Sequence, residues 1–211
     1  MKYKIEPEPS SYISTEDMRK DCRILVGLPV YGGNIEMDTA GSLISLAQIA
    51  ISEKIIVDFF YLTKESLIPR GRNRIVAHFL SSTNNYTHLM SIDADTQFDA
   101  KDIFKMLHYN KDIVSGAVSV KTTPIRYVID LKQKIDRKTN KSKINVSADK
   151  KLVELERCGS AFFLAKRRVF EEMIKAYPEL HADACDLPAE VTKSIIEMKT
   201  IKSENISEYV I

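Results

Sequence analysis

The sequence His-Leu-Met-Ser-Ile-Asp-Ala-Asp-Thr-Gln-Phe, at residues 88–98, passes from apolar side chains to two carboxylates within a few positions. The apolar run that ends at Ile92 is typical of a buried strand, and Asp93 and Asp95 follow it directly. At a strand end, the i, i+2 spacing can direct both carboxylates into one crevice, because strict side-chain alternation no longer holds there. In open α/β sheets, ligands bind outside the carboxyl ends of the strands.

Two neighbouring carboxylates repel each other unless a cation lies between them. Oxygen ligands of this kind suit Mg²⁺ or Mn²⁺, and bound Mg²⁺ normally keeps several waters and takes further ligands from substrate phosphates. An Asp-x-Asp sequence arises by chance about once in a chain of average composition, so a solvated turn is the alternative interpretation. The choice between a metal–diphosphate site and a turn depends on the neighbouring strand ends.

The first neighbouring strand end is Arg-Ile-Leu-Val-Gly-Leu-Pro-Val-Tyr-Gly-Gly, at residues 23–33. A short apolar run is broken by glycine and proline, and residues 37–51 then carry apolar side chains at helical spacing. The unit is therefore a strand, a loop and a helix. It contains neither the Gly-x-Gly-x-x-Gly dinucleotide fingerprint nor the Gly-Lys-Ser/Thr ending of a P-loop. Nucleotide contact and a plain strand-to-helix turn both remain open for this loop.

The second strand end is Val-Asp-Phe-Phe-Tyr-Leu-Thr at residues 57–63, followed by a segment that contains Arg70, Arg72 and Arg74. Arginines near the start of a helix oppose the usual preference for acidic side chains there. Their placement is favourable where an anion binds, because guanidinium groups bind phosphate in a bidentate manner. Solvated surface arginines are the alternative, in which case Asn73 would only cap a turn.

Strand-like and helix-like segments alternate along the chain, which argues for an α/β fold with a mainly parallel sheet and right-handed crossovers. We expect strands near residues 23–28, 56–61, 87–92 and 113–118, and helices near residues 37–52, 71–82 and 99–109. Further strands are expected at 153–156 and 161–164, and a helix at 168–177. The lysine-rich segment 130–151 is predicted to be a solvated hairpin or loop, or else a lid or acceptor-facing arm.

Composition supports one α/β domain with a sizeable core, since the 211 residues are 44% hydrophobic and 28% charged. The net charge of +2 gives no general attraction to nucleic acid. No apolar run approaches the ~20 residues of a membrane span, and the first residues lack an apolar signal-peptide region. The three cysteines lack metal-ligand spacing and are expected to be reduced thiols. We therefore expect a cytoplasmic protein.

Several of these segments resemble the GT-A glycosyltransferases, particularly the small ones encoded by large DNA viruses and bacteriophages. The matching segments are Gly27-Leu-Pro-Val-Tyr31, Pro69-Arg-Gly-Arg-Asn-Arg74, Ser91-Ile-Asp-Ala-Asp-Thr96, Gly116-Ala-Val-Ser-Val120 and Cys158-Gly-Ser-Ala-Phe-Phe-Leu164. The resemblance covers roughly residues 22–172. It implies a GT-A fold, with a single Rossmann-like, mostly parallel sheet flanked by helices and a small antiparallel part on the acceptor side.

The resemblance also implies a nucleotide-sugar donor, which we expect to be a UDP-sugar, and Mn²⁺ or Mg²⁺ as cofactor. The loop at residues 29–31 would cradle the base and ribose, and the carboxylates of Asp93 and Asp95 would hold the metal on the diphosphate. The implied nucleotide-binding residues are Pro29, Val30, Tyr31, Thr63, Arg70, Arg72, Asn73, Asp93, Ala94 and Asp95.

The sequence departs from the family pattern after the 158–164 strand. Many relatives have a Glu-Asp segment some tens of residues later, and no equivalent is visible before Ile211. A late His or Asp closes the metal shell in several GT-A enzymes, so the resemblance makes His181 a candidate metal ligand. Asp183, together with Asp95, is the candidate catalytic residue. The other histidines, His78, His88 and His108, are expected to have packing or surface roles.

The predicted organisation is a polar entry at residues 1–21, a nucleotide-sugar-binding domain at 22–180 and a C-terminal tail at 181–211 that is a candidate lid. The predicted function is metal-dependent hexosyl transfer from a nucleotide-sugar to an unknown glycan or protein acceptor, in the host cytoplasm if the protein is viral. One alternative is a non-catalytic nucleotide-sugar-binding module of a glycan-assembly system. Another is a nucleotidyltransferase, although the glycine-rich loop with a lysine that this class requires is not seen after the first strand.

Overall fold

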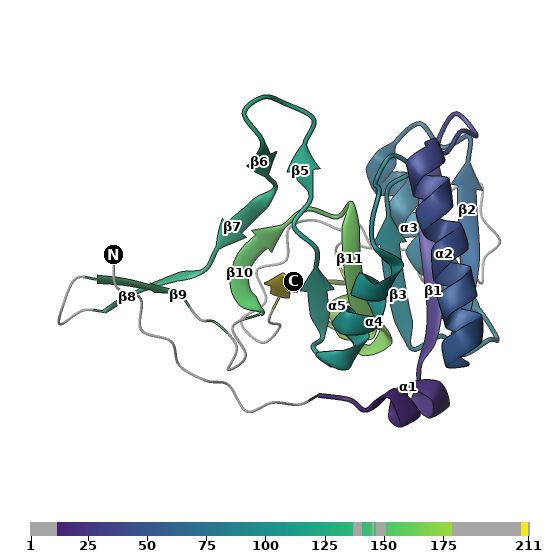
Figure 1. Cartoon of the computed structure of the whole chain (residues 1–211), viewed down its shortest axis with the longest axis horizontal. Helices are drawn as coiled ribbons and strands as arrows, with labels where there is room; N and C mark the ends of the chain where they lie inside the picture. Colours follow the sequence, from purple (N-terminus) through teal and green to yellow (C-terminus); the bar gives the residue numbers. More distant parts are fainter. Residues whose placement is uncertain (1–11, 137–140, 145, 147–150, 179–207, 211) are drawn as a thin grey trace.

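The computed structural model describes residues 12–136, 141–144, 146, 151–178 and 208–210, and its centre is an eight-stranded sheet (Figure 1). In spatial order the strands are β2 (Ile56–Thr63), β1 (Arg23–Val30), β3 (His88–Ile92), β11 (Phe162–Lys166), β4 (Ile113–Ser115), β12 (Glu208–Val210), β10 (Val153–Cys158) and β7 (Ile129–Leu131). All of them except β11 and β10 run in the same direction. The predicted α/β class and mostly parallel sheet are confirmed.

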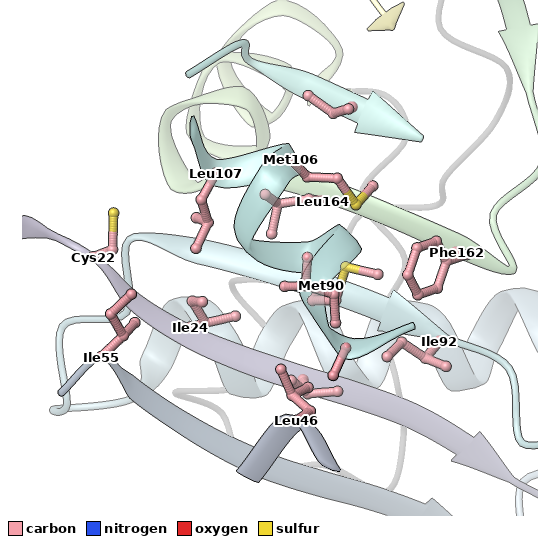
Figure 2. Close-up of a cluster of buried hydrophobic side chains, with 14 of the residues drawn as sticks. Cys22, Ile24, Leu46, Ile55, Met90, Ile92, Met106, Leu107, Phe162 and Leu164 are labelled. Atoms are coloured by element: carbon pink, nitrogen blue, oxygen red, sulfur yellow. The ribbon is translucent and has the colours of Figure 1, made fainter. Parts of the chain in front are cut away.

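Helices cover both faces of this sheet. On one face, α1 (Thr15–Asp21), α2 (Met37–Glu53) and α4 (Ala100–His108) pack against β1 and β3, and on the other face lie α3 (Ile68–Ser81) and α5 (Arg167–Ala176). Alternation along β1 divides its side chains between the layers, because Ile24 and Val26 join the first core cluster while Leu25 joins the second. Figure 2 shows Met90 of β3 and Leu164 of β11 in the first cluster.

The elements expected from the sequence are present, with two informative differences in their limits. Helix α3 begins at Ile68, three residues before the expected start, and Pro69 lies in its first turn, where the missing N–H is not needed. Strand β4 ends at Ser115 instead of continuing to residue 118. A Cβ added at Gly116 would lie 2.6 Å from Phe162 Cδ1. Only glycine therefore allows the backbone to pass so close to this aromatic ring.

Shorter strands extend the fold beyond the main sheet. Strands β5 (Ser119–Val120) and β6 (Arg126–Tyr127) form one hairpin, and β8 (Gln133–Asp136) pairs with β9 (Lys141–Ile144) in another, within the lysine-rich segment. Both hairpins project away from the helix-covered part of the sheet (Figure 1). Within the described residues, no helix is long and apolar enough to cross a membrane.

Candidate functional site

The carboxyl ends of β1, β2 and β3 meet at one edge of the sheet because these strands are parallel. Val30 at the end of β1 lies opposite Thr63 at the end of β2, and Gly27 lies opposite Ser91 of β3. The loops that follow these strands contain the residues implied in nucleotide binding. The backbone joins two of the loops directly, since Lys64 N–H donates to the carbonyl of Tyr31 over 3.1 Å.

Asp93 and Asp95 both line a cleft of about 860 Å³ at this edge. The main chain of Asp93 makes two hydrogen bonds that stabilise the turn after β3. Its N–H donates to the carbonyl of Ala161, just before β11, over 2.9 Å, and its carbonyl accepts from Thr96 N–H over 3.1 Å. The Asp95 side chain is 52% exposed and the Asp93 side chain 29% exposed. The cleft is otherwise lined by Thr96, Gln97, Phe98, Asp102, residues 116–121, Tyr127, Ala161 and Phe162.

Of the three arginines, only Arg72 contacts a carboxylate of the Asp93 and Asp95 pair. Its Nη2 donates to Asp93 Oδ1 over 2.7 Å, and its side chain is only 16% exposed. Its buried Nε has no hydrogen-bond partner among the described residues. A charge-assisted hydrogen bond in a partly buried position is stronger than a surface ion pair, so Arg72 fixes the orientation of Asp93.

Arg70 and Arg74 bind Glu65 instead. Two nitrogens of Arg70 contact the Glu65 carboxylate at 2.7 and 2.8 Å, and Arg74 Nη1 lies 3.3 Å from it. The Glu65 side chain is 2% exposed and also accepts from Leu67 N–H. The hydrogen bond from Arg70 is the chief reason that the pKa of Glu65 lies below its usual value. Sequence reasoning did not single out Glu65, although the acidic residue just before an arginine-rich helix start was a visible signal.

Lys121, which also lines the cleft, contacts Asp95. It extends from the end of β5, and its Nζ lies 3.0 Å from Asp95 Oδ2 and 3.1 Å from Glu36 Oε1. The two carboxylates, Asp95 first, raise the pKa of Lys121, so the side chain is a cation at neutral pH. Neither Lys121 nor Glu36 was a sequence candidate, because no local pattern indicates a contact across 85 residues of chain.

The other implied nucleotide contacts differ in accessibility. Tyr31 is 66% exposed beside the carboxyl edge, whereas Val30 and Asn73 are each 3% exposed, so their side chains belong to the interior. Pro29 lies close to α3, since a Cβ added at Gly71 would lie 3.8 Å from Pro29 Cβ. The backbone carbonyl of Ala94 accepts from Glu36 N–H over 2.9 Å. This hydrogen bond joins the start of α2 to the loop after β3.

Asp93 and Asp95 are the carboxylates expected to hold a divalent cation. The described residues contain no group of three or more His, Cys, Asp or Glu side chains that could hold a metal ion. Asp93 and Asp95 therefore fit Mg²⁺ or Mn²⁺ only if phosphate oxygens and water complete the coordination shell, which is the usual arrangement for substrate-bound Mg²⁺. The exposed contact from Lys121 is of the weak surface kind and does not prevent this. His181, Asp183 and the tail lie outside the described residues.

The described histidines have structural partners away from the cleft. The His78 ring stacks on Phe60 with centroids 4.0 Å apart, and His108 Nδ1 lies 2.9 Å from the carbonyl of Ile13. His88 Nδ1 lies 2.8 Å from Thr87 Oγ1. These contacts agree with the packing and surface roles expected from the sequence.

No family model matches the chain, and no curated protein matches it. A solved structure described as the crystal structure of A197 from STIV is similar over 90% of this chain and 81% of that chain. The TM-score is 0.48 and the sequence identity 19%. A likeness of this degree assigns neither a family nor an activity, so the chemistry has to follow from the site itself.

Proposed function

We propose that this protein is a metal-dependent glycosyltransferase of the GT-A type, which transfers a sugar from a nucleotide-sugar to a glycan or protein acceptor. The observation that carries the proposal is the placement of Asp93 and Asp95 in one large cleft, at the carboxyl edge of the parallel strands. Ligands bind outside this edge in open α/β sheets, and two carboxylates there suit a metal–diphosphate substrate. A UDP-sugar with Mn²⁺ or Mg²⁺ is the expected donor.

The two carboxylates would have different roles. Asp95 is the more exposed, and among the described residues its side chain is held only by the exposed Lys121, so it is the expected direct ligand. Asp93 is already fixed by Arg72, so it would act through a bound water or the ribose. When bound, the metal would serve as a Lewis acid toward the leaving diphosphate. Arg72 would supply further positive charge beside the same group.

The remaining cleft provides room for an acceptor. A volume of about 860 Å³ is in the range of sites that enclose a ligand of moderate size. Beyond the carboxylates, the wall includes Phe98, Phe162 and Tyr127 together with the chain from Gly116 to Val120. Aromatic faces and backbone polar groups suit a sugar, which presents both C–H surface and hydroxyls.

The test is a thermal-shift panel of nucleotide-sugars with and without Mn²⁺, followed by measurement of UDP released from the best donor. We expect Mn²⁺-dependent stabilisation and slow UDP release, both lost in Asp95→Asn. Asp99→Asn is the matched control, because Asp99 caps α4 outside the cleft lining and Asn is an equally good cap.

Three outcomes separate the alternatives. Unchanged UDP affinity of Asp95→Asn in Mn²⁺, measured by calorimetry, would remove the metal-site assignment. Stabilisation of the wild type without any UDP release, with candidate acceptors present, would favour a non-catalytic binding module. Release of pyrophosphate from a nucleoside triphosphate would favour nucleotidyl transfer.

A further inference from the structure

Strand β2 lies at the edge of the main sheet, and its outer side is paired with no other described strand. It runs beside β1 for eight residues in unbroken register, without a bulge or a proline. Proteins usually protect an edge of this length with charges, prolines or bulges, because its free N–H and C=O groups can pair with another chain. The only charged residue in β2 is Asp58, which accepts a hydrogen bond from the Tyr86 hydroxyl over 2.8 Å.

Helix α2, beside this edge, exposes a row of large apolar side chains. Met37, Ile44 and Ile51 are 88%, 61% and 79% exposed, and they follow each other at seven-residue intervals, so they form one stripe along the helix. No charged residue occurs in α2 between Asp38 and Glu53. The exposed side of a helix that faces water is normally rich in charge, and depletion of charge is typical of the centre of a protein interface.

Gly41 is a second, independent feature of α2 that indicates contact with another chain. Glycine inside a helix costs about 1 kcal/mol relative to alanine. A Cβ added at Gly41 would meet nothing within 4 Å, so packing within the described chain does not require glycine here. Gly41 lies four residues after Met37 and three before Ile44, which places it beside the exposed stripe. A glycine there would allow the backbone of another helix to approach closely.

We propose that α2 and β2 form the interface of a symmetric dimer of this chain. In this dimer β2 pairs antiparallel with β2 of the second copy, which joins the two sheets into one. The twofold axis runs perpendicular to the sheet, so both α2 helices lie on the same face and run antiparallel to each other. Figure 1 shows α2 in front of the sheet on the side where β2 forms its edge.

A second copy fits this surface because the surface is self-complementary, as a twofold interface requires. Ile44 is the middle residue of the stripe, so it meets Ile44 of the second copy, while Met37 meets Ile51. The charges at the helix ends are complementary as well. Antiparallel packing brings the acidic start of α2, with Glu36 and Asp38, near Lys54 at the end of the other α2, where the adjacent Glu53 is already paired with Arg19 over 3.0 Å.

The arrangement leaves both candidate sites open. The cleft lies at the carboxyl edge of β1 and β3, and antiparallel pairing of β2 places the two clefts at opposite edges of the joined sheet. The dimer therefore does not depend on the proposed transferase activity and is tested separately from it.

The test is the molar mass in solution, measured by light scattering after size-exclusion chromatography. We expect the wild type to have twice the 24.0 kDa mass of one chain, and Ile44→Glu to have the mass of one chain. Ser45→Glu is the matched control, because Ser45 is exposed on the same helix turn but lies about 100° around the helix from Ile44. Circular dichroism should show that both variants are folded, since Ile44 is mostly exposed.

Cross-linking gives a second measurement that does not depend on stability. With Cys158 and Cys185 replaced by serine, Ile44→Cys should be joined to itself by a short bis-maleimide in high yield, and Ser45→Cys in much lower yield. A wild type with the mass of one chain at roughly 100 µM, or a dimer unaffected by Ile44→Glu, would overturn the proposal. Equal cross-linking of the two cysteine variants would overturn the twofold contact at Ile44.

Discussion

The three arginines at the start of α3 have different environments although they are only two residues apart. Arg70 and Arg74 are separated by about one helical turn, so they lie on the same side of α3 and share the buried carboxylate of Glu65. Arg72 lies on the opposite side and contacts Asp93. The helical geometry therefore assigns one arginine to the cleft and two to the local fold.

This division predicts different effects for two similar substitutions. Arg72→Ala should weaken Mn²⁺-dependent UDP binding by roughly 1.5–3 kcal/mol, the scale of a hydrogen bond to a charged group. Arg70→Ala should leave UDP affinity nearly unchanged and lower the melting temperature, because it removes hydrogen bonds to the buried Glu65. Calorimetric titration and thermal unfolding of both variants measure this. The reverse pattern would show that Arg70, rather than Arg72, faces the nucleotide.

At the residue scale, sequence reasoning could reach only the part of the candidate site that is local in the chain. The Asp93 and Asp95 pair could be found because two carboxylates directly follow an apolar strand. The contact between Lys121 and Asp95 spans 26 residues, and Lys121 lies in a hairpin whose placement depends on the whole sheet. No local spacing encodes such a contact. The different roles of Arg72 and Arg70 are likewise not visible in the sequence, because they depend on where α3 begins and on which side of the helix each arginine lies.

Among the elements, the packing of α3 on β1 is especially close. A Cβ added at Gly27 of β1 would lie 2.3 Å from Ile75 Cγ2 of α3. Overpacking of a tight core typically costs about 1–3 kcal/mol. Because α3 also holds Arg72, any shift of the helix that makes room for a methyl group would move the guanidinium relative to Asp93.

We therefore expect Gly27→Ala to lower the free energy of unfolding by about 1–3 kcal/mol and to weaken nucleotide binding as well. Gly32→Ala is the control, because Gly32 has open space around its Cα and no positive φ. Urea denaturation and UDP titration in Mn²⁺ give the two quantities. Wild-type stability of Gly27→Ala would contradict the close approach of α3 to β1.

Elements with strong periodicity were predicted well, and those determined by distant contacts were not. The alternation of apolar strands with amphipathic helices gave β1 to β4 and α2 to α4 in the correct order. Strand β12 is different, because Glu208–Val210 lies between β4 and β10, whose residues are far away in the chain. A three-residue strand carries too little pattern to be recognised. Helix α1 was also missed, since only Met18 of its seven residues is buried.

At the scale of the whole molecule, the two edges of the parallel strands differ in their titrating groups. The carboxyl edge contains the ion pairs of Asp93, Asp95 and Glu65. At the opposite edge His88 begins β3, and burial, with a smaller contribution from the charge of Lys166, lowers its pKa from 6.5 to about 4. His88 is therefore neutral in the native protein at pH 5 and charged in the unfolded chain.

The different protonation of His88 in the native and unfolded states makes the free energy of unfolding depend on pH. Between pH 6.5 and about pH 4, the unfolded chain binds a proton at His88 that the native protein does not, so the free energy of unfolding should fall as the pH falls. Glu65, whose pKa is also lowered, adds a loss of stability only as the pH falls below about 4.5. The range from pH 6.5 to 5 therefore reports mainly on the histidines, and His78, whose pKa is also lowered by burial, adds a contribution of the same sign to that of His88.

We expect His88→Gln to reduce the slope of unfolding free energy against pH in this range, because glutamine does not titrate. Its amide can still hydrogen-bond to Thr87, so the native fold should be retained. Urea denaturation of wild type and variant at half-unit pH intervals measures both slopes. If the variant kept the full wild-type slope, the proton would be taken up elsewhere in the molecule, and the amino edge of the sheet would not be a source of its acid sensitivity.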